Sequence, residues 1–306
     1  MRVNRVRQNV LPLLAALIWG TAFVAQSVGA DYVGAFTFNA ARSVVAFVFL
    51  LVVSLVLRAV RRRAFPDQPD RYGSRRNLWI GGLCCGTALT VAAYLQQKGL
   101  ETTPSGKAGF LTALYIVIVP IAGLIFKRKP PRAIWISVPL AVVGLYCLCV
   151  TEASSVTVAD FYLLLCAVCF SAHIMVIDHF TQKVDGVYLS CIQFLVATVL
   201  SSIGMFAVES PTWAALQSCS GAVLYAGLLS SGVAYTLQIL AQKDTNPTVV
   251  SLLLSLESVF ATLAGAAVLH DRLSGREYLG CALMLAAVVL AQLPDRKPAK
   301  PVQEHS

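Results

Sequence analysis

The segment SLLLSLESVFATLAGAAVL, residues Ser251–Leu269, is apolar or small almost throughout and carries one carboxylate, Glu257, near its middle. A run of about 20 mostly apolar residues is long enough to cross the hydrocarbon core of a bilayer as a helix. A charge at the centre of such a helix costs about 2.5–3.5 kcal/mol on insertion scales. The segment therefore predicts a transmembrane helix whose single charge has a task that offsets this penalty.

The rest of the chain repeats this apolar pattern. Its 306 residues are 57% hydrophobic and 13% charged, with a mean hydropathy of +0.72, whereas about 25% charged residues is usual in soluble domains. Long apolar runs predict helices, and a membrane barrel would instead show short alternating segments. We expect an all-α polytopic membrane protein with ten transmembrane helices, at approximately 9–29, 33–57, 78–98, 106–126, 133–150, 160–180, 187–208, 220–242, 248–269 and 276–292.

The positive charge indicates how these helices are oriented. A net charge of +9 could suit nucleic-acid binding, but the lysine and arginine residues lie in loops between apolar runs, so no nucleic-acid partner is expected. With the N-terminus in the cytoplasm, most of the 24 lysine and arginine residues fall on the cytoplasmic side. This asymmetry predicts a multi-pass protein of the plasma (inner) membrane with both termini cytoplasmic. The basic loop 58–76 is expected to contact anionic lipid, and the polar tail 294–306 to be disordered.

The two halves of the chain resemble each other. The stretches that begin at Thr102 and Thr245 each have a proline after a polar residue, an apolar helix, a polar junction and a second helix rich in small residues. Trp19 in the first helix aligns near Phe170 in the sixth. Because five is an odd number, a second set of five helices enters the membrane from the opposite side, which predicts an inverted repeat with its site near the midplane. We expect one repeat in 1–150 and the other in 151–293.

Two long stretches resemble one known family. LLAALIWGTAFVAQSVGADYVGAFTFNAARSVVAFVFL (residues 13–50) and AQKDTNPTVVSLLLSLESVFATLAGAAVLHDRLSGREYLGCALMLAAVVL (residues 241–290) are similar to the EamA family of the drug/metabolite transporter (DMT) superfamily. The pair Trp19-Gly20, Arg42 and the triplet Ser255-Leu256-Glu257 match its usual pattern. Ser258 stands where the family usually has proline, which leaves a kink there unpredicted, and Gln26 where it often has lysine. The resemblance implies a ten-helix carrier that moves small metabolites, commonly outward.

Two charges lie deep in the predicted helices. Arg42 and Glu257 are each about 13–14 Å along helices that enter from opposite faces, which places both near the midplane. They could pair across the repeat interface, or each could face a watery cavity. A structural ion pair, a role in substrate binding and a role in proton coupling or gating are all consistent with this depth.

Further polar and aromatic side chains fall within the predicted helices. Each alone is consistent with an interhelical hydrogen bond or with an aromatic residue at the membrane interface. Together they indicate an amphipathic cavity suited to a small zwitterion or an aromatic metabolite. These candidates are Trp19, Asn39, Tyr94, Gln97, Tyr115, His173, Gln193, Tyr235 and Gln238.

The interpretation that follows is a secondary transporter that exports amino acids or related metabolites by alternating access. The alternatives are a structural membrane protein with the same fold and an intramembrane enzyme. The H-x4-D spacing of His173 and Asp178 does not favour the enzyme, because five residues of helix place the two side chains about 140° apart. Nucleotide-binding motifs are absent, and we expect no cofactor and no metal site, with Cys166 and Cys169 as buried thiols. The expected partners are the lipid bilayer and a small-molecule substrate, and the small-x-x-x-small spacing of Ala282 and Ala286 is consistent either with packing within one chain or with a homodimer.

Overall fold

The computed structural model describes residues 2–65, 73–103, 105–125, 130–149, 157–243, 245–269 and 273–292. The predicted disordered tail 294–306 and the centre of the basic loop 58–76 lie outside these residues. The described elements are all helical: α1 Arg2–Ala30, α2 Ala35–Ala64, α3 Arg75–Leu100, α4 Ser105–Ala113, α5 Tyr115–Ile125, α6 Ile134–Cys149, α7 Val158–Thr181, α8 Gly186–Val208, α9 Trp213–Ser218, α10 Ser220–Tyr225, the π-helix η1 Ala226–Ala234, α11 Tyr235–Gln242, α12 Pro247–Leu254, α13 Glu257–Leu269 and α14 Gly275–Ala291.

These elements combine into the ten predicted segments. α4 with α5, α10 with η1 and α11, and α12 with α13 each form one interrupted segment, while the short α9 lies between α8 and α10. Seven segments in the described ranges are long and apolar enough to cross a membrane, and α6, α12–α13 and α14 are shorter. The fold class expected from the sequence is therefore confirmed.

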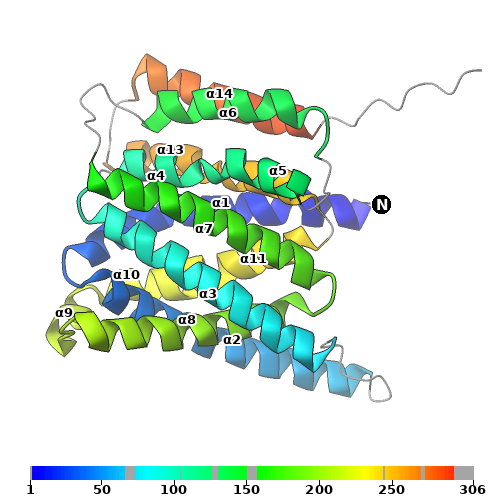
Figure 1. Ribbon diagram of the computed structural model, residues 1–306, viewed down its shortest axis with the longest axis vertical. Coiled ribbons are helices and arrows are strands. Elements are labelled where there is room, and N and C mark those ends of the chain that lie inside the picture. The colour runs from blue at the N-terminus through cyan, green and yellow to red at the C-terminus, as the bar shows by residue number, and fades with distance from the viewer. Residues whose placement is uncertain are drawn as a thin grey trace, which may run out of the picture.

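The two five-helix halves pack into each other rather than side by side. α2 contacts α8, α6 contacts α14, and α3 of the first half contacts α7 of the second. In Figure 1, α6 and α14 lie together at one edge of the molecule, and α2 and α8 lie at the other. The pairs α2–α8 and α6–α14 join equivalent helices of the two halves, and the α3–α7 contact is matched by the contact of α1 with η1 and α11, so the contacts follow the pseudo-two-fold relation of an inverted repeat.

The segment formed by α12 and α13 is interrupted in its middle, although Ser258 stands where a proline would have predicted a kink. At Ser255 and Leu256 the backbone leaves the α-helical pattern, and the Leu256 and Ser258 amides donate to carbonyls three residues back, both at 3.3 Å. The Ser255 hydroxyl donates to the Leu252 carbonyl at 2.8 Å, and such side-chain bonds compete with the helix ladder. As a result Glu257 is the first residue of a new helix in the middle of its segment.

Arginines mark one end of the bundle, which we call the basic end. α2 finishes with Arg61, Arg62 and Arg63, and α3 begins with Arg75, which brings these residues to the same end as the start of α1 (Figure 1). There Gly73, at a φ of 74°, forms an isolated antiparallel bridge with Val184 from the turn between α7 and α8. This bridge joins the first half of the chain to the second.

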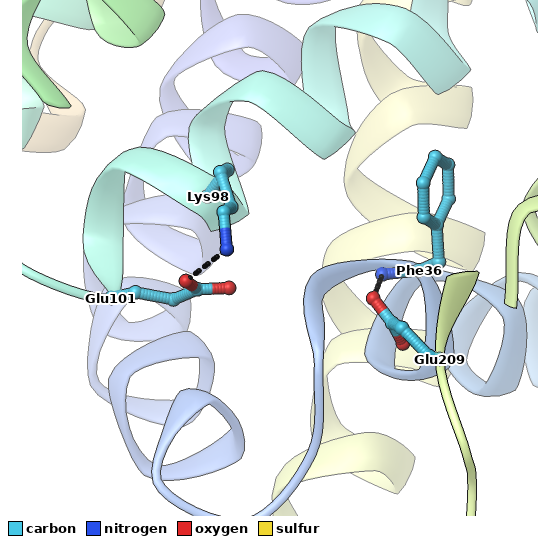
Figure 2. Close-up of polar contacts among 4 residues, drawn as sticks. All are labelled: Phe36, Lys98, Glu101 and Glu209. Atoms are coloured by element: carbon cyan, nitrogen blue, oxygen red, sulfur yellow. Dashed lines mark hydrogen bonds and ion pairs between the residues drawn. The ribbon is translucent and has the colours of Figure 1, made fainter. Parts of the chain in front are cut away.

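Acidic side chains form polar contacts at the opposite end of the bundle. The Glu209 carboxylate, just after α8, accepts from the Phe36 and Thr37 amides at 2.9 and 2.8 Å, as Figure 2 shows for Phe36. A carboxylate at this position satisfies free amides and opposes the helix dipole. Lys98 and Glu101 form an ion pair at 2.5 Å nearby (Figure 2). Because Glu209 belongs to the second half and α2 to the first, its contact is a second link between the halves.

Candidate functional site

A small central cavity lies where the two halves meet. Its volume is about 40 Å³, and its walls come from both halves. Roughly 10–15 Å³ of such volume holds one water molecule, so the cavity has room for about three. Its lining residues are Trp19, Phe23, Gln26, Arg42, Gln96, Thr112, Tyr115, Phe170, Ile174, Ser230, Tyr235, Gln238, Leu254 and Glu257.

The two deep charges both line this cavity. Arg42 and Glu257 are each 5% exposed. Arg42 Nη1 donates to Gln26 Oε1 at 3.3 Å, and the guanidinium lies 5.9 Å from the Phe38 ring centre. Glu257 Oε1 accepts from the Tyr115 hydroxyl at 3.4 Å. Among the described residues these two charges do not form an ion pair with each other, so the cavity presents both signs at separate places.

Each charge has a neutral counterpart at the same register of the other half. Arg42 is the eighth residue of α2, and Gln193 is the eighth residue of α8. Glu257 is the first residue of α13, and Tyr115 is the first residue of α5, so both follow the breaks in their segments. The breaks thus bring Tyr115 and Glu257 into hydrogen-bonding contact at the interface of the halves.

Aromatic side chains form one wall around Tyr235. The Tyr235 ring lies 4.7 Å from the Trp19 ring, 5.9 Å from His173 and 5.7 Å from Phe194, measured between centroids. The Trp19 indole nitrogen donates to the Ser230 carbonyl of η1 at 3.2 Å. A π-helix commonly marks a functional site. Here it holds the tryptophan whose ring lines the cavity.

Five predicted residues lie outside the central cavity. His173 Nε2 and Gln193 Oε1 are 2.8 Å apart, and Gln97 donates to the Gln26 carbonyl at 2.9 Å, so these three support the wall. Tyr94 stacks on Phe36 at 4.1 Å between centroids. The fifth, Asn39, lines a second and smaller cavity. Trp19, Arg42, Tyr115, Tyr235, Gln238 and Glu257 are the predicted residues that the structure brings together.

Sequence reasoning missed part of the lining. Gln96, Thr112 and Ser230 are polar wall residues without a pattern that singles them out. Phe170 was detectable, since it aligns near Trp19 between the halves. Across the described ranges no group of three or more His, Cys, Asp or Glu side chains could hold a metal ion, and Cys166 and Cys169 are free thiols.

Known proteins resemble this chain over nearly its whole length. The model of the EamA-like transporter family matches residues 8–150 and 157–293. Two proteins of Archaeoglobus fulgidus, each described as an uncharacterized transporter, are similar. One is 30% identical over 296 residues, 95% of this chain and 87% of the relative. The other is 24% identical over 291 residues, 93% and 98%. A solved crystal structure aligns with a TM-score of 0.75 at 19% identity, covering 93% of this chain and 96% of that one, which shows a shared fold.

Proposed function

Because this chain belongs to the EamA-like transporter family and is a multi-pass membrane transporter, we propose that it exports small zwitterionic metabolites, amino acids or related compounds. Transport proceeds by alternating access: the two halves rock around the central cavity and expose it to one side of the membrane at a time. The substrate binds between Arg42 and Glu257, with the Trp19 and Tyr235 rings against its apolar part.

One observation carries this proposal: a buried guanidinium and a buried carboxylate line one cavity without pairing with each other. Burying a charge without a partner is costly, and a structural ion pair would remove that penalty by direct contact. A zwitterion supplies a carboxylate for Arg42 and an ammonium group for Glu257 at the same time. The unpaired arrangement therefore fits substrate recognition better than a structural role.

The small volume of the cavity supports alternating access. Sites that hold a small molecule usually measure about 300–1,000 Å³, far above the 40 Å³ seen here. Polar links between the halves are present at both ends of the bundle: Lys107 pairs with Asp160 at 2.7 Å and Glu209 caps α2 at one end, and Gly73 bridges Val184 at the basic end. These features are consistent with an occluded state, in which the central cavity is closed to both sides of the membrane.

Orientation and assembly remain part of the proposal. The positive-inside asymmetry supports a basic end in the cytoplasm with both termini inside, and we propose the plasma (inner) membrane as the location. Ala282 and Ala286 are exposed on α14, as a contact with a second copy requires. The repeats are assigned to 1–150 and 151–293.

The test compares metabolites in the medium of cells that overexpress the protein with those of control cells. We expect one class of zwitterionic metabolite to accumulate outside, and Arg42→Gln and Glu257→Gln to abolish this accumulation while still inserting at wild-type levels. Ser137→Ala is the matched control, because Ser137 is buried in α6 away from the cavity. Variants that merely lose folded protein, with normal flux per folded molecule, would favour a structural role for the two charges.

A further inference from the structure

A second, smaller cavity lies beside the central one. Its volume is about 10 Å³, which is close to the space of one water molecule. Arg42 and Tyr235 line both cavities, so they form the boundary between the two. The remaining walls come from α2, α3, α8 and η1, and they include Asn39 of α2 and Ser231 of η1.

Unpaired polar atoms gather in this second cavity. Asn39 is 2% exposed, and among the described residues neither its amide nitrogen nor its amide oxygen has a hydrogen-bond partner. The hydroxyl of Ser231, which is 1% exposed, is likewise unpaired within the part of the chain that the structure describes. Buried polar groups in native proteins are nearly always paired, with protein, water or ligand. Two such residues on one cavity therefore point to an occupant that bonds to them.

The charge of the lining selects the sign of that occupant. Arg42 is the charged residue among the lining residues, and this lining contains no carboxylate. A guanidinium offers five N–H donors, and within the described residues the bond to Gln26 is the hydrogen bond that Arg42 makes. Asn39 and Ser231 each add a donor. Several donors around one positive charge favour an anion, because hydrogen bonds to charged acceptors are the strong ones.

We propose that the second cavity is an anion subsite, in which Arg42, Asn39 and Ser231 bind one monovalent anionic group. This inference rests on the proposed function. The subsite would orient the substrate, because its anionic group lies on the Arg42 side of the central cavity and the rest of the molecule extends toward Glu257. Two sources share this chemistry, the carboxylate of the transported zwitterion and a free small anion such as chloride.

Equilibrium binding tests the subsite without any transport assay. Purified protein in lipid nanodiscs is titrated with sodium chloride or sodium acetate at constant ionic strength, made up with sodium sulfate, and the thermal unfolding midpoint is followed. An anion that binds the folded state raises the midpoint in a saturable way. We expect such a rise in the wild type and an apparent dissociation constant at least tenfold weaker in Asn39→Leu.

The choice of leucine separates the anion subsite from a structural role. Leucine has nearly the shape of asparagine and removes both unpaired atoms, so in sulfate alone Asn39→Leu should be at least as stable as the wild type. Ser231→Ala, which loses a single donor, should weaken anion binding several-fold and decides the question if the leucine variant does not fold. Ser137→Ala loses only a bond to the Ala133 carbonyl and should bind as the wild type does. No saturable rise in the wild type, or the same rise in Asn39→Leu, would mean a buried water only and would overturn the subsite.

Transport in proteoliposomes then distinguishes the two sources. If chloride raises the KM for a zwitterionic substrate and leaves the maximal rate unchanged, the subsite takes the substrate's own carboxylate. If flux requires chloride, the subsite takes a free anion beside the substrate. Both results support the subsite. Anion binding that depends on Asn39, with no flux of any zwitterion tested, would refute the proposed function and leave the subsite standing.

Discussion

Gly20 offers the sharpest test of how the site is built. It lies in α1 where this helix crosses α13, and a Cβ atom added there would lie 2.6 Å from the Glu257 carbonyl oxygen and 2.8 Å from the Ala261 amide nitrogen. Both neighbours are backbone atoms, which cannot turn aside as a flexible side chain can. To reach an ordinary contact of 3.4 Å, α1 and α13 must separate by about 0.8 Å, the difference between 3.4 and 2.6 Å.

The expected effect of Gly20→Ala follows from this separation. Overpacking of this kind costs about 1–3 kcal/mol, and the better helix propensity of alanine returns about 0.5–1 kcal/mol. We expect a net destabilisation of up to about 2.5 kcal/mol, seen as a fall of up to a few degrees in the thermal unfolding midpoint. Because α13 begins with Glu257, the shift also strains its hydrogen bond to Tyr115, which is 3.4 Å long. Flux per folded molecule should therefore fall as well.

Gly221→Ala is the matched control. It also lies in a helix, α10, but a Cβ atom there meets nothing within 4 Å. This variant should gain up to about 1 kcal/mol from helix propensity and transport normally. The measurement is the thermal midpoint of both variants in the same nanodiscs, with flux in proteoliposomes. A Gly20→Ala midpoint equal to or above that of the wild type, with full flux, would refute the close crossing of α1 and α13.

The remaining predictions concern the polar contacts. Glu209→Ala should lower the free energy of unfolding by about 1–2 kcal/mol, because three donors of Phe36 and Thr37 lose their acceptor; an unchanged midpoint would contradict the cap on α2. Glu257→Gln keeps the shape of the side chain but loses its charge, and should weaken the binding of ammonium-bearing substrates at least tenfold in a competition assay. Equal losses for substrates without an ammonium group would argue against this role. Tyr115→Phe removes the donor to Glu257 and leaves that buried carboxylate without this hydrogen bond, so the KM should rise and the free energy of unfolding should fall by about 1–3 kcal/mol; an unchanged KM and an unchanged thermal midpoint would argue against the contact.

Much of the fold follows from apolar pattern alone. A spanning helix needs length and hydropathy, and both are visible in the sequence, so the bounds of the ten segments agree with the helices within three residues, except that α1 begins and α2 ends seven residues beyond the predicted bounds. The depth of Arg42 and Glu257 in the membrane stays a prediction, which rests on converting position along a helix into depth through the rise per residue. That they share one cavity without pairing was left open, since pairing depends on how far each helix is rotated about its axis.

Other features depend on packing that one sequence does not display. His173 and Gln193 contact each other because α7 and α8 face inward at those residues, and no spacing rule connects two helices. The break before Glu257 coincides with the bond from the Ser255 hydroxyl to the Leu252 carbonyl, and a serine in a helix carries no signal comparable to a proline. Asn39 shares a helix face with Arg42 but lines a different cavity, which only the surrounding side chains determine.

Equivalent positions in the two halves carry different residues, and this difference has a consequence for the relative energies of the substrate-free conformations. In a carrier whose halves exchange conformations, identical halves make the inward-open and outward-open forms isoenergetic. Here Arg42 is matched by Gln193 and Glu257 by Tyr115, so under the proposed alternating access each form would surround the charges with a different set of neighbours. The resting population would then be biased toward one form. Without coupling to an ion, that bias gives different KM values on the two membrane faces while the ratio of maximal rate to KM stays equal, because a carrier cannot shift the equilibrium of its own substrate.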